Sequence, residues 1–367
     1  MPMPERATLI DRLHVVQRGE LTPARTWAYR LLAVLGALVT GGLLLLFLGL
    51  NPFSVYATML RGALGSAGMQ KETIKLMIPL CLATLGVALA FKMRFWNIGG
   101  EGQICAGAIA ASYFAYFHNG LPSWLLLIVM AVAAILAGGL WGLIPAYFKT
   151  RFGTNETLFT LMLNYIVMYF ITYLREGPWR NPEGGFAAMP RFTKQARLPE
   201  VPIPGVGNVH IGWIVMLVMV VALFIYLRHT KQGYELTVVG ENEMTARYAG
   251  MPVKKIVMRT MFISAGICGL VGMLQVSGPD RQLTDAVANG RGFTAVSVAW
   301  LARLSPGGIL IVSFLFSVLQ KGCSMMQTEY RIPASMSDIL QGVILFFVLG
   351  SEFFIRYRIA LRKEARA

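Results

Sequence analysis

The segment Leu31–Leu50 reads LLAVLGALVTGGLLLLFLGL and contains no charged residue. A helix of roughly 20 apolar residues crosses a bilayer core about 30 Å thick, so this segment is long enough to span a membrane. The segment Ile211–Leu227 has the same character, and about ten such apolar runs follow one another along the chain. The hydrophobic fraction is 56%, the charged fraction 14% and the mean hydropathy +0.58. The sequence therefore predicts an all-α, polytopic membrane protein.

We predict about ten transmembrane helices and one further helix at the membrane interface. The third span should begin with polar, glycine-rich residues, and the eighth is short. The more polar segment 54–67 should form the interfacial helix. The spans are expected at residues 31–50, 73–91, 95–117, 123–148, 154–174, 211–227, 256–276, 292–304, 308–319 and 336–355.

The net charge of +15 has two interpretations, binding to nucleic acid or orientation of the protein in the membrane. The Lys and Arg residues lie between the apolar runs and form no single basic face, so the sequence favours orientation and no nucleic-acid partner. With an even number of spans, we expect both termini in the cytoplasm of a cell (inner) membrane. Residues 1–30 would form a leader that is not a cleavable signal peptide, 31–355 the transmembrane domain, and 356–367 a cytoplasmic tail.

Two loops are long enough to have functions of their own. The extracytoplasmic loop 176–210 is rich in proline and glycine, and we expect a mobile segment, a docking surface or a solvated connector. The cytoplasmic loop 229–255 should contain a short helix from Glu241 to Ala249, ended by Gly250 and Pro252. Small residues at Ala246 and Ala249 would let this helix enter a cleft in another protein; the alternative is an ordinary amphipathic connector.

Residues 97–103 read NIGGEGQ, an unusual beginning for a helix in lipid. Irregular backbone at membrane depth is tolerated only where protein or a water-filled cavity covers it, and a charge there is costly. One interpretation is a broken helix whose N–H groups and side chains face a polar substrate. The other is an interfacial position in which Glu101 pairs with Lys92 or Arg94.

A second interrupted segment, ANGRGF, occupies residues 288–293. One interruption in each half of the chain is typical of inverted repeats whose broken helices meet near the membrane midplane. In the fifth span, Glu156, Thr160 and Asn164 recur at four-residue spacing and should share one helical face. That face would line a polar passage or contact another helix.

Several stretches resemble the integral membrane subunit of an ATP-binding-cassette importer. The resemblance is to the simple sugar and nucleoside branch, which is related to ribose-type and branched-chain amino acid permeases. The stretches are FWNIGGEGQ at 95–103, NET at 155–157 with LMLNY at 161–165, VGEN at 239–242 with ARYAG at 246–250, and GFTAVSVA at 292–299. Trp300 and Arg303 depart from the small apolar helix that this family usually has there.

The resemblance implies a permease moving a nucleoside or simple sugar by alternating access, with residues 240–250 as the coupling helix. Its partners would be a cytoplasmic ATPase, a second permease subunit, identical or homologous, an extracytoplasmic substrate-binding protein and membrane lipid. We assign the substrate pathway to Asn97, Glu101, Gln103, Glu156, Thr160, Asn164, Tyr165 and Phe293. The aromatic rings of Tyr165 and Phe293 can stack on a base. We assign ATPase coupling to Gly240, Glu241, Asn242, Ala246, Ala249 and Gly250.

The sequence predicts no enzyme activity for this chain. It contains no Gly-x-x-x-x-Gly-Lys-Ser/Thr phosphate loop, so we expect no cofactor on the chain itself and ATP on the partner ATPase. Its four cysteines form no Cys-x-x-Cys pair, and no metal site is expected. The alternative function is a secondary transporter coupled to ions, which would need a carboxylate within the membrane. Glu101 and Glu156 are the candidates for that role.

Overall fold

The computed structural model describes residues 13–17, 22–181 and 188–361. Most of the leader predicted at 1–30, and the end of the tail predicted at 356–367, lie outside these residues. The chain divides into two compact units, one formed by residues 1–59 with 323–367 and the other by residues 60–322. Helices α2 (Pro52–Leu64) and α12 (Pro306–Tyr330) contribute residues to both units.

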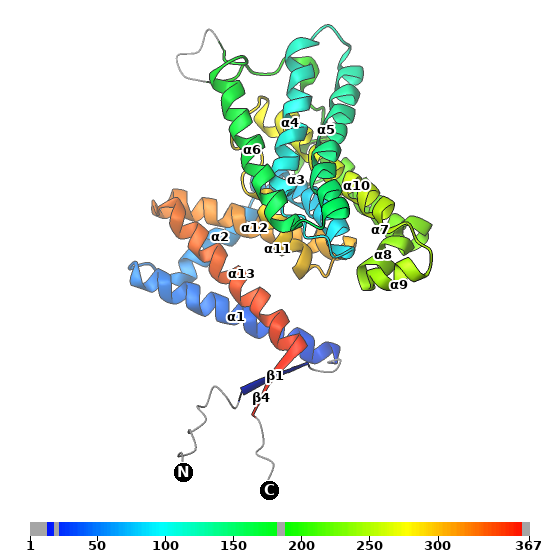
Figure 1. The fold of residues 1–367 in the computed structure, drawn as a ribbon. Coiled ribbons are helices and arrows are strands. Elements are labelled where there is room, and N and C mark those ends of the chain that lie inside the picture. Colours follow the sequence, from blue (N-terminus) through cyan, green and yellow to red (C-terminus); the bar gives the residue numbers. More distant parts are fainter. Residues whose placement is uncertain (1–12, 18–21, 182–187, 362–367) are drawn as a thin grey trace, which may run out of the picture. The chain divides into compact units, whose positions relative to one another are not determined.

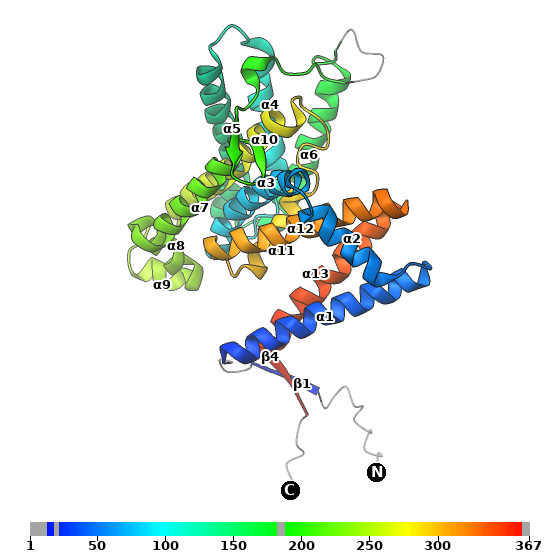
Figure 2. The ribbon, with the colours of Figure 1, turned by 180° about the vertical axis from the view of Figure 1, so that it is seen from behind.

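The first unit is built on two long helices, α1 (Pro23–Phe47) and α13 (Ala334–Arg356), which pack against each other along their lengths (Figures 1 and 2). The strands β1 (Leu13–Gln17) and β4 (Tyr357–Leu361) precede and follow them and pair antiparallel. The Tyr56 hydroxyl of α2 donates a hydrogen bond to the Leu38 carbonyl at 2.7 Å. Helix α1 begins at Pro23, before the predicted boundary at residue 31.

The second unit contains most of the helices and the segments of interest for function. In chain order these are α3 (Ala67–Lys92), α4 (Gly100–Phe117), α5 (Ser123–Phe152), α6 (Glu156–Glu176), α7 (Gly212–His229), α8 (Lys231–Glu241), α9 (Glu243–Tyr248), α10 (Val253–Gln275), the π-helical turn η2 (Val276–Asp280) and α11 (Arg291–Leu301). Every residue of α3 from Met77 to Phe91 is buried. A helix that is apolar on all sides is stable in such a central position.

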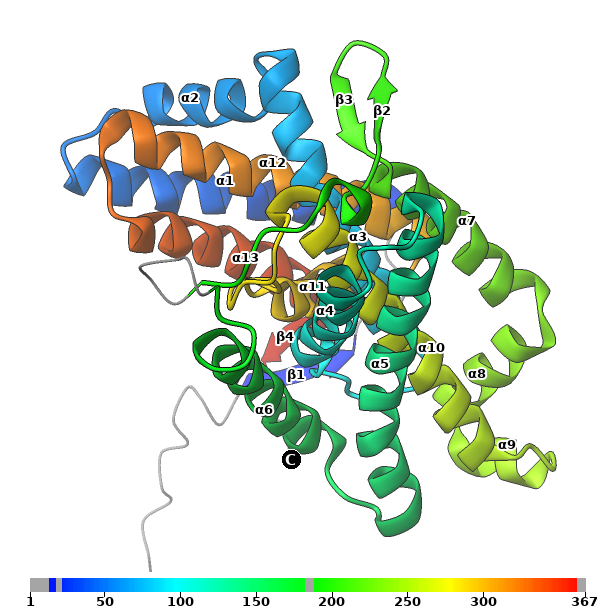
Figure 3. The ribbon, with the colours of Figure 1, turned by 90° about the horizontal axis from the view of Figure 1, so that it is seen from above.

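Helix α10 packs against α3, α4 and α5, and together these four helices form the centre of the unit (Figures 1 and 3). Small residues allow the close approach. A side chain at Gly269 of α10 would overlap with the Ala134 carbonyl and lie 3.0 Å from the Cα of Gly138, both in α5. Tight contacts between small residues are a main source of helix association in membranes.

The helices confirm the predicted fold class, and each predicted span coincides with a helix. Within the described ranges, seven helices are long and apolar enough to cross a membrane, or up to eight if the bent pair formed by α1 and α2 counts as one span. Helix α11 has only 11 residues. At about 1.5 Å per residue it is too short to cross a 30 Å core, so the predicted eighth span is wrong. Helix α4 begins at Gly100, because residues 93–99 leave the helical conformation.

The loop predicted at 176–210 contains regular structure that the sequence did not predict. Outside residues 182–187 it forms a short 3₁₀ turn, η1 (Lys194–Ala196), and a hairpin of β2 (Glu200–Ile203) and β3 (Gly207–His210) (Figure 3). The side chain of Phe192 is buried. The Phe192 and Leu198 N–H groups donate hydrogen bonds to the carbonyls of Arg281 and Ser277. The described part of the loop is therefore bonded to the η2 turn and to the residue after it, and is more than a solvated connector.

Candidate functional site

The interrupted segment before α4 is held by a pair of buried side-chain amides. The Asn97 Oδ1 accepts hydrogen bonds from the Gln103 Nε2 and the Gly99 N–H, each at 3.0 Å. The Asn97 Nδ2 donates to the Gln103 Oε1 at 3.2 Å. Both amides are buried. Besides bonding to each other, they provide an acceptor for the Gly99 N–H, and irregular backbone inside a membrane protein requires such partners.

Glu101 joins the two interrupted segments. Its Oε1 accepts a hydrogen bond from the Gly290 N–H at 2.6 Å and its Oε2 one from the Gly292 N–H at 2.7 Å. The carboxylate thus lies at the N-terminus of α11, where the unpaired N–H groups and the helix dipole favour a negative charge. Residue 292 must be glycine, because a Cβ there would overlap with the backbone nitrogen of Glu101.

This contact excludes one of the two interpretations of Glu101 that the sequence left open, and the role of Glu101 toward a substrate stays a prediction. The carboxylate is only 2% exposed, and its hydrogen-bond partners are backbone N–H groups of α11. An interfacial pair with Lys92 or Arg94 is not the observed arrangement. The two interrupted segments are in contact through Glu101, Gly290 and Gly292. The inverted repeat that suggested this contact stays a prediction.

One face of α6 completes this framework. Glu156, Thr160 and Asn164 are buried on the same face, as their spacing predicts. The Asn164 side chain accepts from the Gly102 N–H at 2.8 Å and donates to the Ile98 carbonyl at 3.0 Å. The Thr160 hydroxyl accepts from the Ile98 N–H at 3.3 Å. This face therefore contacts the interrupted segment directly.

The predicted pathway residues separate into two groups. Asn97, Glu101, Gln103, Thr160 and Asn164 are buried and bonded to other groups of the chain. Glu156 is also buried, and its carboxylate lies 2.8 Å from the Lys149 ammonium. By contrast, Tyr165 is 50% and Phe293 39% exposed. The first six form a supporting framework around the interrupted segment, and only the last two expose a large surface.

Tyr165 belongs to an exposed aromatic face of α6 that the sequence analysis did not single out. Tyr169 is 73% and Tyr173 61% exposed. The three tyrosines are spaced four residues apart, so they follow one side of the helix. That four-residue spacing is visible in the sequence and could have predicted this tyrosine face.

The segment assigned to ATPase coupling forms two helices. Asn242 separates α8 from α9, and its Oδ1 accepts hydrogen bonds from the Met244 and Thr245 N–H groups at 2.9 and 3.2 Å. The predicted helix from Glu241 to Ala249 corresponds to α9, which begins two residues later than predicted because Asn242 is its N-cap. Gly250, with φ at +73°, follows the end of α9 as expected for a helix stop.

The exposed residues of this segment also differ from those predicted. Ala246 is fully buried, so it cannot enter a cleft in another protein. Gly240 is buried against the backbone carbonyl of Lys92. The groups that project into the surroundings are Met244, 59% exposed, and Tyr248, 87% exposed. Glu241, Asn242, Ala249 and Gly250 are exposed as well.

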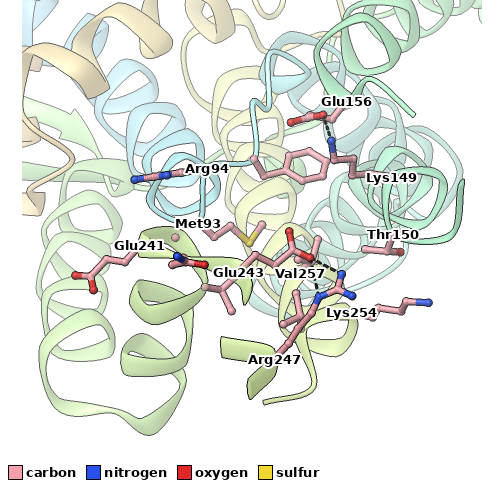
Figure 4. A pocket seen from close by; sticks show the side chains of 15 residues that line it. Met93, Arg94, Lys149, Thr150, Glu156, Glu241, Glu243, Arg247, Lys254 and Val257 are labelled. Atoms are coloured by element: carbon pink, nitrogen blue, oxygen red, sulfur yellow. Dashed lines mark hydrogen bonds and ion pairs between the residues drawn. The ribbon is translucent and has the colours of Figure 1, made fainter. Parts of the chain in front are cut away.

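A cavity of about 360 Å³ lies between this segment and the broken start of α4 (Figure 4). Its walls come from residues 93–95, the end of α5, the start of α6, α8, α9 and the start of α10. The Lys149–Glu156 ion pair lines the cavity together with Glu243 and Arg247, which are paired at 2.5 Å. Glu156 is thus a neighbour of the coupling segment.

Trp300, one of the two departures from the family pattern, has a packing role. Its ring lies 5.7 Å from that of Phe91 and 5.6 Å from that of Trp96. Phe91 and Trp96 are 5.5 Å apart, so the three rings form one cluster between α3 and α11.

Comparison with known proteins shows which family the chain belongs to. A family model described as "Branched-chain amino acid transport system / permease component" matches residues 71–349. The chain belongs to this family. The match includes every residue assigned above to the pathway and to coupling.

Three relatives match the permease over nearly its whole length. The glucose ABC transporter permease protein TsgB13 of Haloferax volcanii is 34% identical and covers 95% of both chains. The guanosine ABC transporter permease protein NupP of Bacillus subtilis is 31% identical over 92% of this chain and 97% of its own. The nucleoside ABC transporter permease protein NupB of Lactococcus lactis is 30% identical over 92% and 94%.

Family membership establishes the general function. The chain is a permease subunit of an ABC transporter, and ATP hydrolysis takes place in a separate subunit. It is therefore not itself an enzyme. The alternative of an ion-coupled secondary transporter is not favoured, and neither of its two candidate carboxylates is free: both Glu101 and Glu156 have partners within the chain.

Proposed function

We propose that the permease moves a nucleoside or a simple sugar inward by alternating access, driven by ATP bound to a partner ATPase. The three relatives support this substrate class, because their names specify glucose, guanosine and nucleosides. A sugar ring and a nucleobase both present flat faces and several polar groups. A passage for such solutes needs aromatic surfaces combined with hydrogen-bonding groups.

The exposed tyrosines of α6 are the observation that carries the proposal. Tyr165 and Tyr169 lie near the middle of a helix long and apolar enough to span the membrane. A tyrosine hydroxyl that faces hydrocarbon has no hydrogen-bond partner, which costs free energy. These side chains therefore favour a wetter environment than lipid. We assign them to the wall of the passage, which a second permease subunit would complete.

The positions of the loops support the proposed orientation. Three segments predicted to be cytoplasmic, at 93–94, 149–150 and 239–257, line one common cavity (Figure 4). Segments predicted to be extracytoplasmic line two other cavities, one of them together with residues 277–281 after α10. We place both termini and the α8–α9 segment in the cytoplasm, where the ATPase binds. The substrate-binding protein would dock on the side of the β2–β3 hairpin.

The contacts suggest how motion of the ATPase reaches the passage. Met244 and Tyr248 of α9 would contact the ATPase, and Gly240 of α8 touches the backbone at Lys92. The next residues form the interrupted segment, which is bonded to α6 through Asn164 and to α11 through Glu101. A displacement of α8 would thus shift the start of α4 relative to both helices. This contiguous set of contacts is the physical basis of the proposed coupling.

Substitution of Tyr169 tests the assignment of the passage. We expect Tyr169→Ala to reduce ATP-driven uptake of guanosine or glucose, whichever the wild type carries, by about threefold to tenfold, because one aromatic contact contributes about 0.5–1.5 kcal/mol. The matched control is Tyr147→Ala, which removes a 51% exposed tyrosine from α5. Uptake should be measured at equal amounts of assembled complex. Equal uptake by the two variants would remove α6 from the passage.

A further inference from the structure

A second, smaller cavity lies where the β2–β3 hairpin meets the π-helical turn that follows α10. Its volume is about 180 Å³, room for roughly six water molecules at liquid density. Binding sites for drug-sized molecules usually exceed about 300 Å³, so the cavity suits a smaller group. Its polar lining residues are Lys75, Arg197, Glu200, His210, Ser277 and Arg281.

Two of these side chains are buried without a partner. His210 is 5% exposed and Ser277 fully buried. No group in the described part of the chain bonds to either ring nitrogen of His210 or to the Ser277 hydroxyl. A buried polar atom left without a hydrogen bond costs about 1–3 kcal/mol. Three such atoms around one cavity indicate that its contents supply the missing partners.

The imidazole of His210 is held in place by backbone. A Cβ at Gly212, the first residue of α7, would lie 2.6 Å from the His210 Cε1 and Nδ1. A Cβ at Gly278, in the π-helical turn, would lie 3.2 Å from its Cγ. The absence of both side chains leaves room for the ring between the two segments. π-helical turns of this kind occur frequently at functional sites.

The cavity has an excess of positive charge. Lys75, Arg197 and Arg281 line it with a single carboxylate, that of Glu200. Arg281 is the cation least committed elsewhere, since its guanidinium is 3.8 Å from that carboxylate. Lys75 is paired with Glu72 at 2.7 Å, and Arg197 donates to the Phe192 carbonyl. Cations combined with neutral N–H and O–H donors are the usual partners of an oxyanion.

We propose that the His210–Ser277 cavity binds a single oxyanion group, a carboxylate or a phosphate. The anion would bond to Arg281 and accept hydrogen bonds from the Ser277 hydroxyl and one His210 N–H. It is either a free anion or the side chain of an acidic residue from a protein that covers this face. The inference does not depend on which solute the permease carries.

The test uses the full-length purified protein in detergent. Binding is detected as a change in the melting temperature, measured at constant ionic strength. The probes are inorganic phosphate and N-acetylglutamate α-amide, which presents one carboxylate as a side chain does, and chloride is the reference. We expect at least one probe to raise the melting temperature in a saturable way, and chloride to leave it unchanged. Tighter binding of phosphate indicates a free anion, and tighter binding of the glutamate derivative indicates an acidic side chain; both results support the inference.

Three variants locate the response. Ser277→Ala removes a hydroxyl that makes no bond within the described structure, so the unliganded protein should be no less stable, whereas affinity for the better probe should fall about tenfold. Arg281→Gln should weaken binding at least as much. Lys71→Gln is the control, since Lys71 is 3.9 Å from Glu200 but does not line the cavity, and it should bind normally. No response in the wild type, or a response unchanged in both cavity variants, would overturn the inference.

Discussion

Glu101 illustrates how much of this permease depends on single polar residues. The sequence indicates that a carboxylate beside three glycines needs a compensating group, but not which one. That group consists of two N–H donors 189 and 191 positions away in the chain. Local spacing carries no information about such a partner. The sequence could therefore predict that Glu101 is important, but it could not predict which groups Glu101 contacts.

Removal of the Glu101 carboxylate should destabilise the protein strongly. Glu101→Ala leaves the Gly290 and Gly292 N–H groups buried without acceptors, and hydrogen bonds to a charged group contribute about 1.5–3 kcal/mol each. We expect a loss of about 3 kcal/mol or more, measured as a fall in the melting temperature in detergent. Glu156→Ala is the control: its partner Lys149 is 41% exposed, so the pair should contribute about 1 kcal/mol or less. Equal losses in the two variants would refute the role given to Glu101.

His210 should make the protein sensitive to acid. Burial, aided by the Lys75 ammonium, lowers the pKa of His210 from 6.5 to about 4. Between these values the unfolded chain binds a proton that the folded protein does not. The free energy of unfolding should therefore fall as the pH is lowered from about 6.5 to about 4, by up to about 3 kcal/mol.

The variant His210→Gln should lose this part of the pH dependence. Melting temperatures measured between pH 7 and pH 4 in a chloride buffer should fall less steeply for this variant than for the wild type as the pH is lowered. Ser277→Ala changes the same cavity without removing a titratable group, so its pH profile should follow the wild type. A His210→Gln profile parallel to that of the wild type would contradict the assignment.

At the scale of elements, the sequence was most informative about long helices. Every predicted span coincides with a helix because apolar runs of this length have few alternatives in lipid. The break of α4 was visible as NIGGEGQ, since its residues are poor at covering a lipid-facing helix. The β2–β3 hairpin was missed, because its strands have only four residues each. The burial of Ala246 depends on tertiary packing and could not be read from the loop.

Contacts between α6 and the interrupted segment should control the order of that segment. Asn164→Leu removes the bonds to the Gly102 N–H and the Ile98 carbonyl. Cys105, a free and fully buried thiol one turn into α4, should then react faster with a maleimide, as measured by mass spectrometry. Uptake should fall as well, because the start of α4 is no longer positioned.

The control for this experiment lies on the same helix. Thr172→Ala removes a hydroxyl whose one bond within the described residues goes to the Met168 carbonyl of α6, at 3.4 Å. Its Cys105 labelling rate should equal that of the wild type. An Asn164→Leu protein with the same slow labelling would show that α6 does not support the interrupted segment.

The exposed side chains of α9 should determine binding of the ATPase. Tyr248→Ala removes the most exposed large side chain of the proposed contact, and interface aromatic residues often contribute about 2 kcal/mol or more. We expect at least tenfold weaker association with the ATPase in a pull-down, while the permease itself stays folded. Tyr234→Ala, at a 63% exposed position on α8, is the control. If both variants bind the ATPase equally well, α9 is not the principal contact.

At the scale of the whole molecule, the chain supplies a transmembrane framework and a surface for a separate ATPase subunit. The buried polar groups around the start of α4 are bonded to one another, and exposed tyrosines follow α6. The composition and the apolar runs predicted this class of protein without reference to any partner. The number of complete spans required three-dimensional information, because a short helix such as α11 looks like a span in a hydropathy pattern.

The central claim is that an external ATPase, and no ion gradient, drives solute through this permease. The most direct test is uptake into proteoliposomes that contain the permease with its partner subunits, with ATP inside and the binding protein outside. The account predicts accumulation of the solute that requires ATP hydrolysis and is unaffected by a protonophore. Accumulation without ATP that a protonophore abolishes would contradict it.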